Sequence, residues 1–168
     1  LVMHTGLKMK PNVQDGVSLY TYSRAEGDFH AENVRIGDGR IVFDLVSPFG
    51  NISDIELGVP VSVNIENGIA AIALAQIAGA SAEEIRKGMA SFGGVDRRFD
   101  FHVKTDRMVY VSDYAHHPEE IRHCLESMKE LYSGRRIKVI FQPHLYTRTR
   151  DFYREFADAL SLVDDVCV

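Results

Sequence analysis

The sequence is poor in cysteine and contains no long apolar run. Its two cysteines, Cys124 and Cys167, do not form a Cys-x-x-Cys pair, and both lie in apolar patterns. Such patterns favour buried free thiols over a disulfide, which suits a reducing cytosol. No apolar stretch approaches the roughly 18 residues needed to span a bilayer, and no secretory leader is visible. We therefore expect a cytoplasmic protein with no membrane partner.

An excess of basic residues is also missing. The chain has 19 Lys and Arg against 24 Asp and Glu, which gives a net charge of -5. A nucleic-acid-binding surface would normally be basic, so we expect no nucleic-acid partner. The arginines nevertheless cluster at 97–100, 134–136 and 148–150. Local arginine clusters in an acidic protein indicate a small anionic ligand rather than a polyanion.

The first part of the chain reads as strands followed by helices. Strand patterns lie at 17–23, 28–36, 40–47 and 52–60, and Asp38-Gly39 predicts a hairpin between the second and third. A helix begins near residue 64, with Ile65, Ile69 and Ile72 on one face, and ends at Gly79. Ser81 and Glu84 predict a capping box for a second helix, whose apolar stripe is Ile85, Met89 and Phe92.

The second part alternates strand and helix. "GGVDRRFD" at 93–100 is a candidate hinge, and strands are expected at 108–112, 137–141 and 166–168. Helices are expected from Pro118 to Leu131 and over 151–163. This order predicts a parallel β-α-β-α-β unit with right-handed crossovers. We expect an α/β chain with two partial domains, 1–97 and 98–168.

Two polar clusters follow two of the expected parallel strands. "DYAHHP" follows the first, and "QPHLYTRTR" follows the second. Ligands bind outside the carboxyl ends of strands in an open parallel sheet. If these strands are neighbours, one crevice collects Asp113, His116, His117, His144 and Arg148.

Each of these residues also has a structural interpretation. Asp113 could cap the following helix, and His116 and His117 could be a surface pair. A zinc site is disfavoured because two adjacent histidines do not easily ligate one ion. Arg148 is expected to point at a ligand, whereas Arg150 falls at the start of a helix.

Asn64 and Asn67 lie at i and i+3, so they share a helix face, and one is a candidate N-cap. An amide offers an acceptor and two donors, which match the edge of a base such as adenine. In the hinge, Arg97 or Arg98 could reach a phosphate when two domains close.

Four stretches of the sequence resemble the Mur ligases, the ATP-dependent amide-forming enzymes of peptidoglycan precursor synthesis. They are "NIENGIAAIALA", "FGGVDRRFD", "DYAHHP" and "FQPHLYTRTRDF", and they span roughly residues 60–160. The last is similar to a motif of the alanine-adding branch. The resemblance implies the end of a central ATP-binding domain, β-rich and then helical, followed by an incomplete Rossmann-like domain.

The resemblance also implies two sets of site residues. The set that would contact ATP is Asn64 and Asn67 at the adenine, Arg98 at the phosphates, Asp113 at the ribose and Tyr114 beside the nucleotide. The set that would face the muramyl substrate and the alanine carboxylate is His116, His144 and Arg148. The implied partners are UDP-N-acetylmuramate, L-alanine and ATP, with Mg²⁺ bridging the phosphates. The reaction would proceed through an acyl phosphate.

The chain departs from the family pattern in several places. Leu145 stands where the alanine-adding branch usually has arginine. No G-x-x-G-K-[ST] loop is present, and no metal ligand of the family is expected in this chain. We therefore expect a fragment that is inactive alone, with self-association through uncovered surfaces.

Three other functions stay open. A sister ligase would add a different amino acid or a recycled peptide. A non-catalytic nucleotide-binding module would keep the motifs without the chemistry. A metal hydrolase would use His116, His117 and His144.

Overall fold

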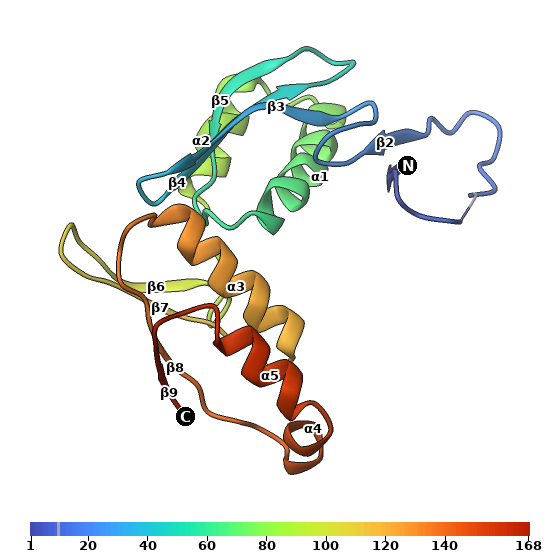
Figure 1. The fold of residues 1–168 in the computed structure, drawn as a ribbon. Coiled ribbons are helices and arrows are strands. Elements are labelled where there is room, and N and C mark those ends of the chain that lie inside the picture. Colours follow the sequence, from blue (N-terminus) through green and yellow to red (C-terminus); the bar gives the residue numbers. More distant parts are fainter. Residues whose placement is uncertain (10) are drawn as a thin grey trace. The chain divides into compact units, whose positions relative to one another are not determined.

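The computed structural model describes residues 1–9 and 11–168 and has mixed α/β structure (Figure 1). It divides into two compact units, residues 1–36 with 40–93 and residues 37–39 with 94–168. This confirms the predicted fold class. Among the described residues, no helix combines the length and apolarity that crossing a bilayer requires.

The first unit contains two small sheets and two helices. β1 (Val2–His4) pairs in parallel with β2 (Tyr20–Tyr22). β3 (His30–Gly37), β4 (Arg40–Val46) and β5 (Ile52–Glu56) form a three-stranded sheet in that order. α1 (Val63–Ile77) and α2 (Ala82–Ser91) follow, and Figure 1 shows them beside this sheet.

One apolar core holds this unit together. Alternate side chains of β4 are buried because one face of the sheet is covered. They meet the inner face of α1, and the largest buried side chains are Phe29, Ile41, Phe43, Leu45, Ile52, Ile55, Ile65, Ile69 and Ile72. The predicted helix face at residues 65, 69 and 72 is therefore confirmed.

The local turn and cap signals in residues 38–91 are also confirmed. Asp38 and Gly39 both have positive φ, 50° and 70°, as the predicted hairpin requires. The Ser81 side chain accepts the Glu84 N–H, and the Glu84 carboxylate accepts the Ser81 N–H. The prediction that Phe92 belongs to the apolar stripe of α2 was wrong. Its side chain is 54% exposed, because the backbone leaves the helical conformation at this residue.

The second unit begins with a hairpin. β6 (Asp100–Lys104) pairs antiparallel with β7 (Val109–Ser112). β8 (Lys138–Ile140) pairs in parallel with β9 (Asp165–Cys167). The parallel pairing is as predicted, but within the described residues no ladder joins β7 to β8. β7 instead pairs with β6, a strand that sequence analysis did not predict, since a tight turn at 105–108 makes this pairing local.

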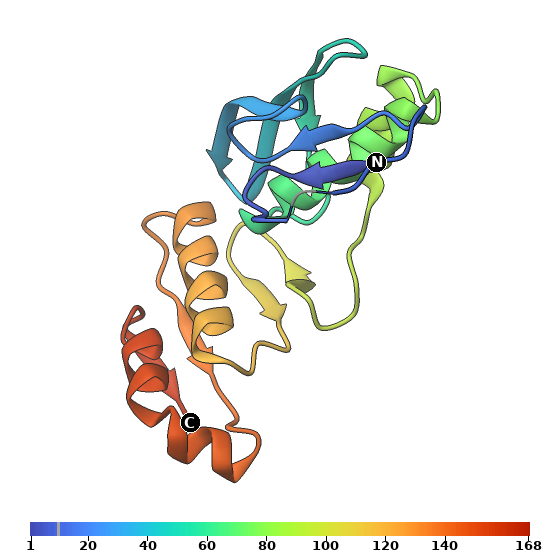
Figure 2. The ribbon, with the colours of Figure 1, turned by 90° about the vertical axis from the view of Figure 1, so that its right-hand side faces the viewer.

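Three helices complete the second unit. α3 (Pro118–Leu131) and α5 (Tyr153–Leu160) pack side by side, as Figures 1 and 2 both show. Their shared core consists of Ile121, Leu125, Phe156, Ala159 and Leu160. α4 (Tyr146–Asp151) precedes α5. The helix predicted over 151–163 corresponds to α5, which is shorter because Phe152 leaves the helical conformation, and α4 was not predicted.

The two thiols differ in exposure. Cys124 is partly buried on α3, and burial raises its pKa to about 12. Cys167 is exposed. Both thiols are free, but the prediction that both are buried was wrong for Cys167.

Candidate functional site

The loop between β7 and α3 carries the first polar cluster. The Asp113 carboxylate accepts two backbone hydrogen bonds, at 2.8 Å from the Phe99 N–H and at 2.7 Å from the Ala115 N–H. The Tyr114 N–H in turn donates to the Arg97 carbonyl at 2.7 Å. The segment that contains the predicted hinge arginines is therefore tied directly to this loop.

Glu120 holds the other end of the same loop. Its Oε2 accepts the backbone N–H groups of His116 at 2.9 Å and of His117 at 3.3 Å. These bonds, the first above all, lower the pKa of the Glu120 carboxyl, and charge attraction from His116 and Arg98 adds to the effect. Sequence analysis missed Glu120 as a site residue. The available signal was an acid at the third position of a helix that begins with proline.

The His116 imidazole is oriented by two acceptors. Its Nδ1 lies 2.9 Å from the Tyr114 carbonyl oxygen and 3.4 Å from Glu120 Oε2. A carbonyl and a carboxylate oxygen can only accept, so Nδ1 carries the proton. In the neutral ring, Nε2 is then a hydrogen-bond acceptor. The half-buried imidazole also packs against the Tyr114 ring, with 5.2 Å between centroids.

The second polar cluster reaches the first through one arginine. Arg148 Nη1 donates to the His116 carbonyl at 3.2 Å. Arg150 is instead engaged locally, since its Nε donates to Asp151 at 2.8 Å. Both arginines lie within α4, so the prediction that the helix starts only near Arg150 was wrong. Within residues 1–9 and 11–168, the other guanidinium N–H groups of Arg148 make no hydrogen bond, so they are available to a ligand.

The remaining residues of the two clusters differ in their surroundings. His117 packs its ring against Phe152, with 5.3 Å between centroids, which is a packing role. His144 is exposed and makes no hydrogen bond within the described part of the chain. Leu145 has φ of 69° and is exposed.

Arg98 lies between two residues with unusual backbone. Arg97 and Phe99 have φ of 60° and 50°, in the left-handed region that non-glycine residues rarely adopt. Phe99 is buried at 3% exposure, whereas Arg98 is exposed. Its guanidinium makes no hydrogen bond to any described residue, which leaves it available to an anion.

The two predicted adenine-contacting residues lie on α1 in the first unit. Asn67 Nδ2 donates to Asn64 Oδ1 at 3.1 Å, so the shared face is confirmed. Asn64 Nδ2 donates to the Val59 carbonyl at 3.1 Å. The N-cap of α1 is Ser62, so the suggestion that an asparagine caps this helix was wrong. Asn67 is exposed and retains its own carbonyl oxygen as an acceptor.

A known family and its members match this chain. Residues 97–168 match the family described as "Mur ligase, glutamate ligase domain". The UDP-N-acetylmuramate–L-alanine ligase of Phocaeicola vulgatus is 63% identical over 99% of this chain and 36% of its own length. The chain is therefore similar to Mur ligases over nearly its whole length. The ligase of the same name from Parabacteroides distasonis is 57% identical over 99% of the chain and 36% of its own length. The chain thus spans about a third of these Mur ligases.

Two solved structures share the fold of this chain. The UDP-N-acetylmuramate–alanine ligase of Thermotoga maritima superposes with a TM-score of 0.74 at 30% identity, over 88% of this chain and 33% of that one. The folylpolyglutamate synthetase of Lactobacillus casei superposes with a TM-score of 0.70 at 23% identity, over 90% of this chain and 36% of that one. The similarity to the folylpolyglutamate synthetase concerns the fold alone.

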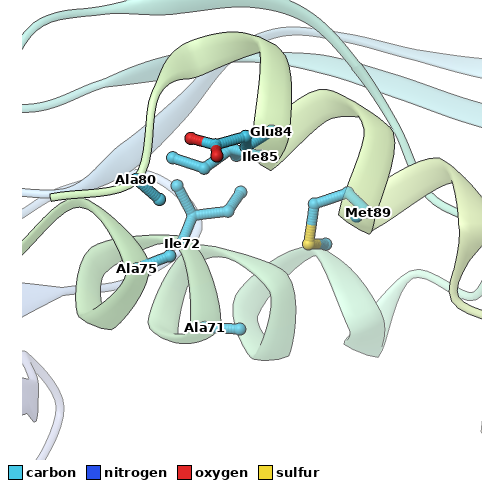
Figure 3. Close-up of a pocket in the computed structure, with 8 residues that line it drawn as sticks. Ala71, Ile72, Ala75, Ala80, Glu84, Ile85 and Met89 are labelled. Carbon is cyan, nitrogen blue, oxygen red and sulfur yellow. The ribbon is translucent and has the colours of Figure 1, made fainter. Parts of the chain in front are cut away.

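A groove in the first unit is separate from every predicted site residue. It lies between α1 and α2, has a volume of about 220 Å³ and is almost wholly apolar (Figure 3). Its lining includes Ile72, Ile85 and Met89, while the Glu84 carboxylate at its rim is bonded to Ser81. The groove offers no arrangement of polar groups for a nucleotide.

The histidines do not form a metal centre with acidic or thiol side chains. Across residues 1–9 and 11–168, no three His, Cys, Asp or Glu side chains come together as metal ligands. The metal-hydrolase interpretation therefore gains no support from the geometry.

Proposed function

We propose that this chain is part of an ATP-dependent ligase that joins L-alanine to UDP-N-acetylmuramate in the cytoplasm. The observation that carries this proposal is the 63% identity to a UDP-N-acetylmuramate–L-alanine ligase over 99% of the chain. The contact between Arg148 and His116 supports it, because it brings the two predicted substrate motifs together.

The proposed reaction has two steps. A carboxylate oxygen of the lactyl group attacks the γ-phosphorus of ATP, the bond from that phosphorus to ADP breaks, and an acyl phosphate forms. The alanine amine then attacks the acyl carbon, the carbon–oxygen bond to phosphate breaks, and nitrogen loses a proton. The products are the amide, ADP and phosphate. Phosphoryl transfer of this kind depends mainly on positioning and on positive charge.

The second unit would supply positive charge and orientation. The free guanidinium of Arg98 suits the ATP phosphates. Arg148 suits the alanine carboxylate, which a guanidinium binds through paired donors. His116 would present Nε2 to the alanine amine as a hydrogen-bond acceptor, and exposed His144 would contact the muramyl substrate.

The nucleotide would also contact the two asparagines and the loop after β7. Asn64 and Asn67 would face adenine, with Tyr114 beside the nucleotide. The Asp113 carboxylate would receive a ribose hydroxyl, since each oxygen retains a lone pair after its backbone hydrogen bond. Mg²⁺ would accompany ATP. The described residues form no cluster of metal ligands, so we assign the ion no ligand and no step on this chain.

Phosphate release tests the proposal. The full-length protein should release phosphate with UDP-N-acetylmuramate, ATP and Mg²⁺ only when L-alanine is added. The 168-residue polypeptide should release none under the same conditions. Release with a different amino acid would favour a sister ligase. Nucleotide binding without release by the full-length protein would favour a non-catalytic module and overturn the proposal.

We also propose that the isolated 168-residue polypeptide self-associates. The ladder of β8 and β9 exposes apolar side chains, with Ile140 at 81% and Val166 at 41%. Exposed apolar strand edges favour pairing with another chain. Light scattering should therefore give a mass above that of the monomer, and a monodisperse monomer would contradict this.

A further inference from the structure

Asp113 binds the protein itself in a way that the proposed contact with ribose does not explain. Its Oδ2 accepts the Phe99 N–H at 2.8 Å, and its Oδ1 accepts the Ala115 N–H at 2.7 Å. A third bond runs beside these two, from the Tyr114 N–H to the Arg97 carbonyl at 2.7 Å. The carboxylate thus joins two segments that lie 14 residues apart in the sequence.

The segment held by Asp113 is one that needs external support. Arg97 and Phe99 both have left-handed φ, which is unfavourable for residues that carry a Cβ. Hydrogen bonds from a charged acceptor are stronger than neutral ones and can stabilise such a conformation. The buried Phe99 ring, edge-on to Phe101 with 5.5 Å between centroids, also holds this segment.

Arg98 lies between the two left-handed residues, so its direction depends on their backbone. If the Phe99 N–H loses its acceptor, Phe99 can return to a more favourable φ, and the Arg98 side chain then points elsewhere. We propose that Asp113 is a positioning residue that latches residues 97–99 and thereby aims the Arg98 guanidinium. The functional consequence rests on the proposed ligase function, whereas the latch itself does not.

Amide hydrogen exchange on the full-length protein tests the latch without any activity. Asp113→Ala should speed exchange at the Phe99 amide about tenfold or more, as expected for the loss of one charge-assisted hydrogen bond. Asp106→Ala is the matched control, because Asp106 is an exposed acid of the same unit that makes no hydrogen bond among the described residues. The Leu125 amide in α3 should stay unchanged and report intact folding. Unchanged exchange at Phe99 would overturn the proposal.

Kinetics on the same full-length variants test whether the latch acts through Arg98. Asp113→Ala and Arg98→Ala should each lower kcat about tenfold or more, and the double variant should be little worse than Arg98→Ala. The loss from Asp113→Ala should persist with 2′-deoxy-ATP and 3′-deoxy-ATP. If either deoxynucleotide abolishes the loss, Asp113 acts on ribose and not on Arg98. If the wild type shows no ligase activity, the proposed function fails, and hydrogen exchange alone decides the latch.

Discussion

Glu120 should stabilise the second unit by accepting hydrogen bonds from backbone N–H groups at the start of α3. Glu120→Ala removes the acceptor of two backbone N–H groups, those of His116 and His117. Loss of such a cap typically costs about 1 kcal/mol, in a range of about 0.5–2 kcal/mol. Loss of a negative charge at a helix N-terminus costs about 0.3–1 kcal/mol more. Since the side chain is 39% exposed, we expect a total of about 1–2 kcal/mol.

Glu119 provides a matched control. It lies in the same first turn of α3 but makes no hydrogen bond among the described residues. Glu119→Ala should lose only the charge effect, about 0.3–1 kcal/mol. Urea unfolding of the 168-residue polypeptide, followed by circular dichroism, should therefore separate the two variants by about 1 kcal/mol. Equal stabilities would refute the assigned hydrogen bonds.

The contribution of Glu120 to the stability of the second unit should depend on pH. The pKa of Glu120 is lowered from its ordinary value of 4.5, chiefly by the His116 N–H. A carboxyl with a lowered folded-state pKa contributes stability above its unfolded value and loses it as the pH falls through the folded value. The difference between wild type and Glu120→Ala should be complete at neutral pH and should shrink below about pH 4.5. A stability difference that grows on acidification would contradict a lowered pKa for Glu120.

Three further predictions concern packing, thiol reactivity and substrate binding. Gly58→Ala should destabilise the first unit by about 1–3 kcal/mol, because the added Cβ meets backbone carbonyl oxygens at the end of α2. At Gly88 an added Cβ meets no atom among the described residues, so Gly88→Ala should stabilise α2 by about 1 kcal/mol. Thermal unfolding checks both, and equal effects would contradict the packing. Cys167 should react with a thiol reagent well before Cys124, whose pKa is raised to about 12, and mass spectrometry of partly labelled protein should locate the first adduct. If the full-length protein is the proposed ligase, Arg148→Ala should raise its KM for L-alanine about tenfold or more, and an unchanged KM would remove Arg148 from the carboxylate site.

Features fixed by local chemistry could be predicted from the sequence. The Asp38-Gly39 hairpin depends on two residues that tolerate positive φ, and both adopt it. The capping box at Ser81 and Glu84 depends on a spacing of three residues, and both of its hydrogen bonds form. Such signals lie within a few residues and do not require knowledge of the tertiary structure.

Features fixed by contacts between distant segments were missed. The strand at 100–104 was not predicted, because its charged residues hide the strand pattern that pairing with β7 stabilises. The left-handed backbone of Phe99 is supported by Asp113, 14 residues away, so no local pattern reveals it. The clustering of the two motifs was expected from strand order, but their contacts were not: Arg148 donates to the His116 carbonyl, and the His117 ring packs against Phe152.

The central claim is that the full-length protein activates a carboxylate with ATP and passes it to L-alanine. The most direct test uses UDP-N-acetylmuramate with ¹⁸O in the lactyl carboxylate, together with ATP, Mg²⁺ and L-alanine. Mass spectrometry should find the alanyl amide product and one ¹⁸O in each phosphate released, because a carboxylate oxygen leaves with the phosphoryl group. Unlabelled phosphate, or no amide product with L-alanine, would contradict the account.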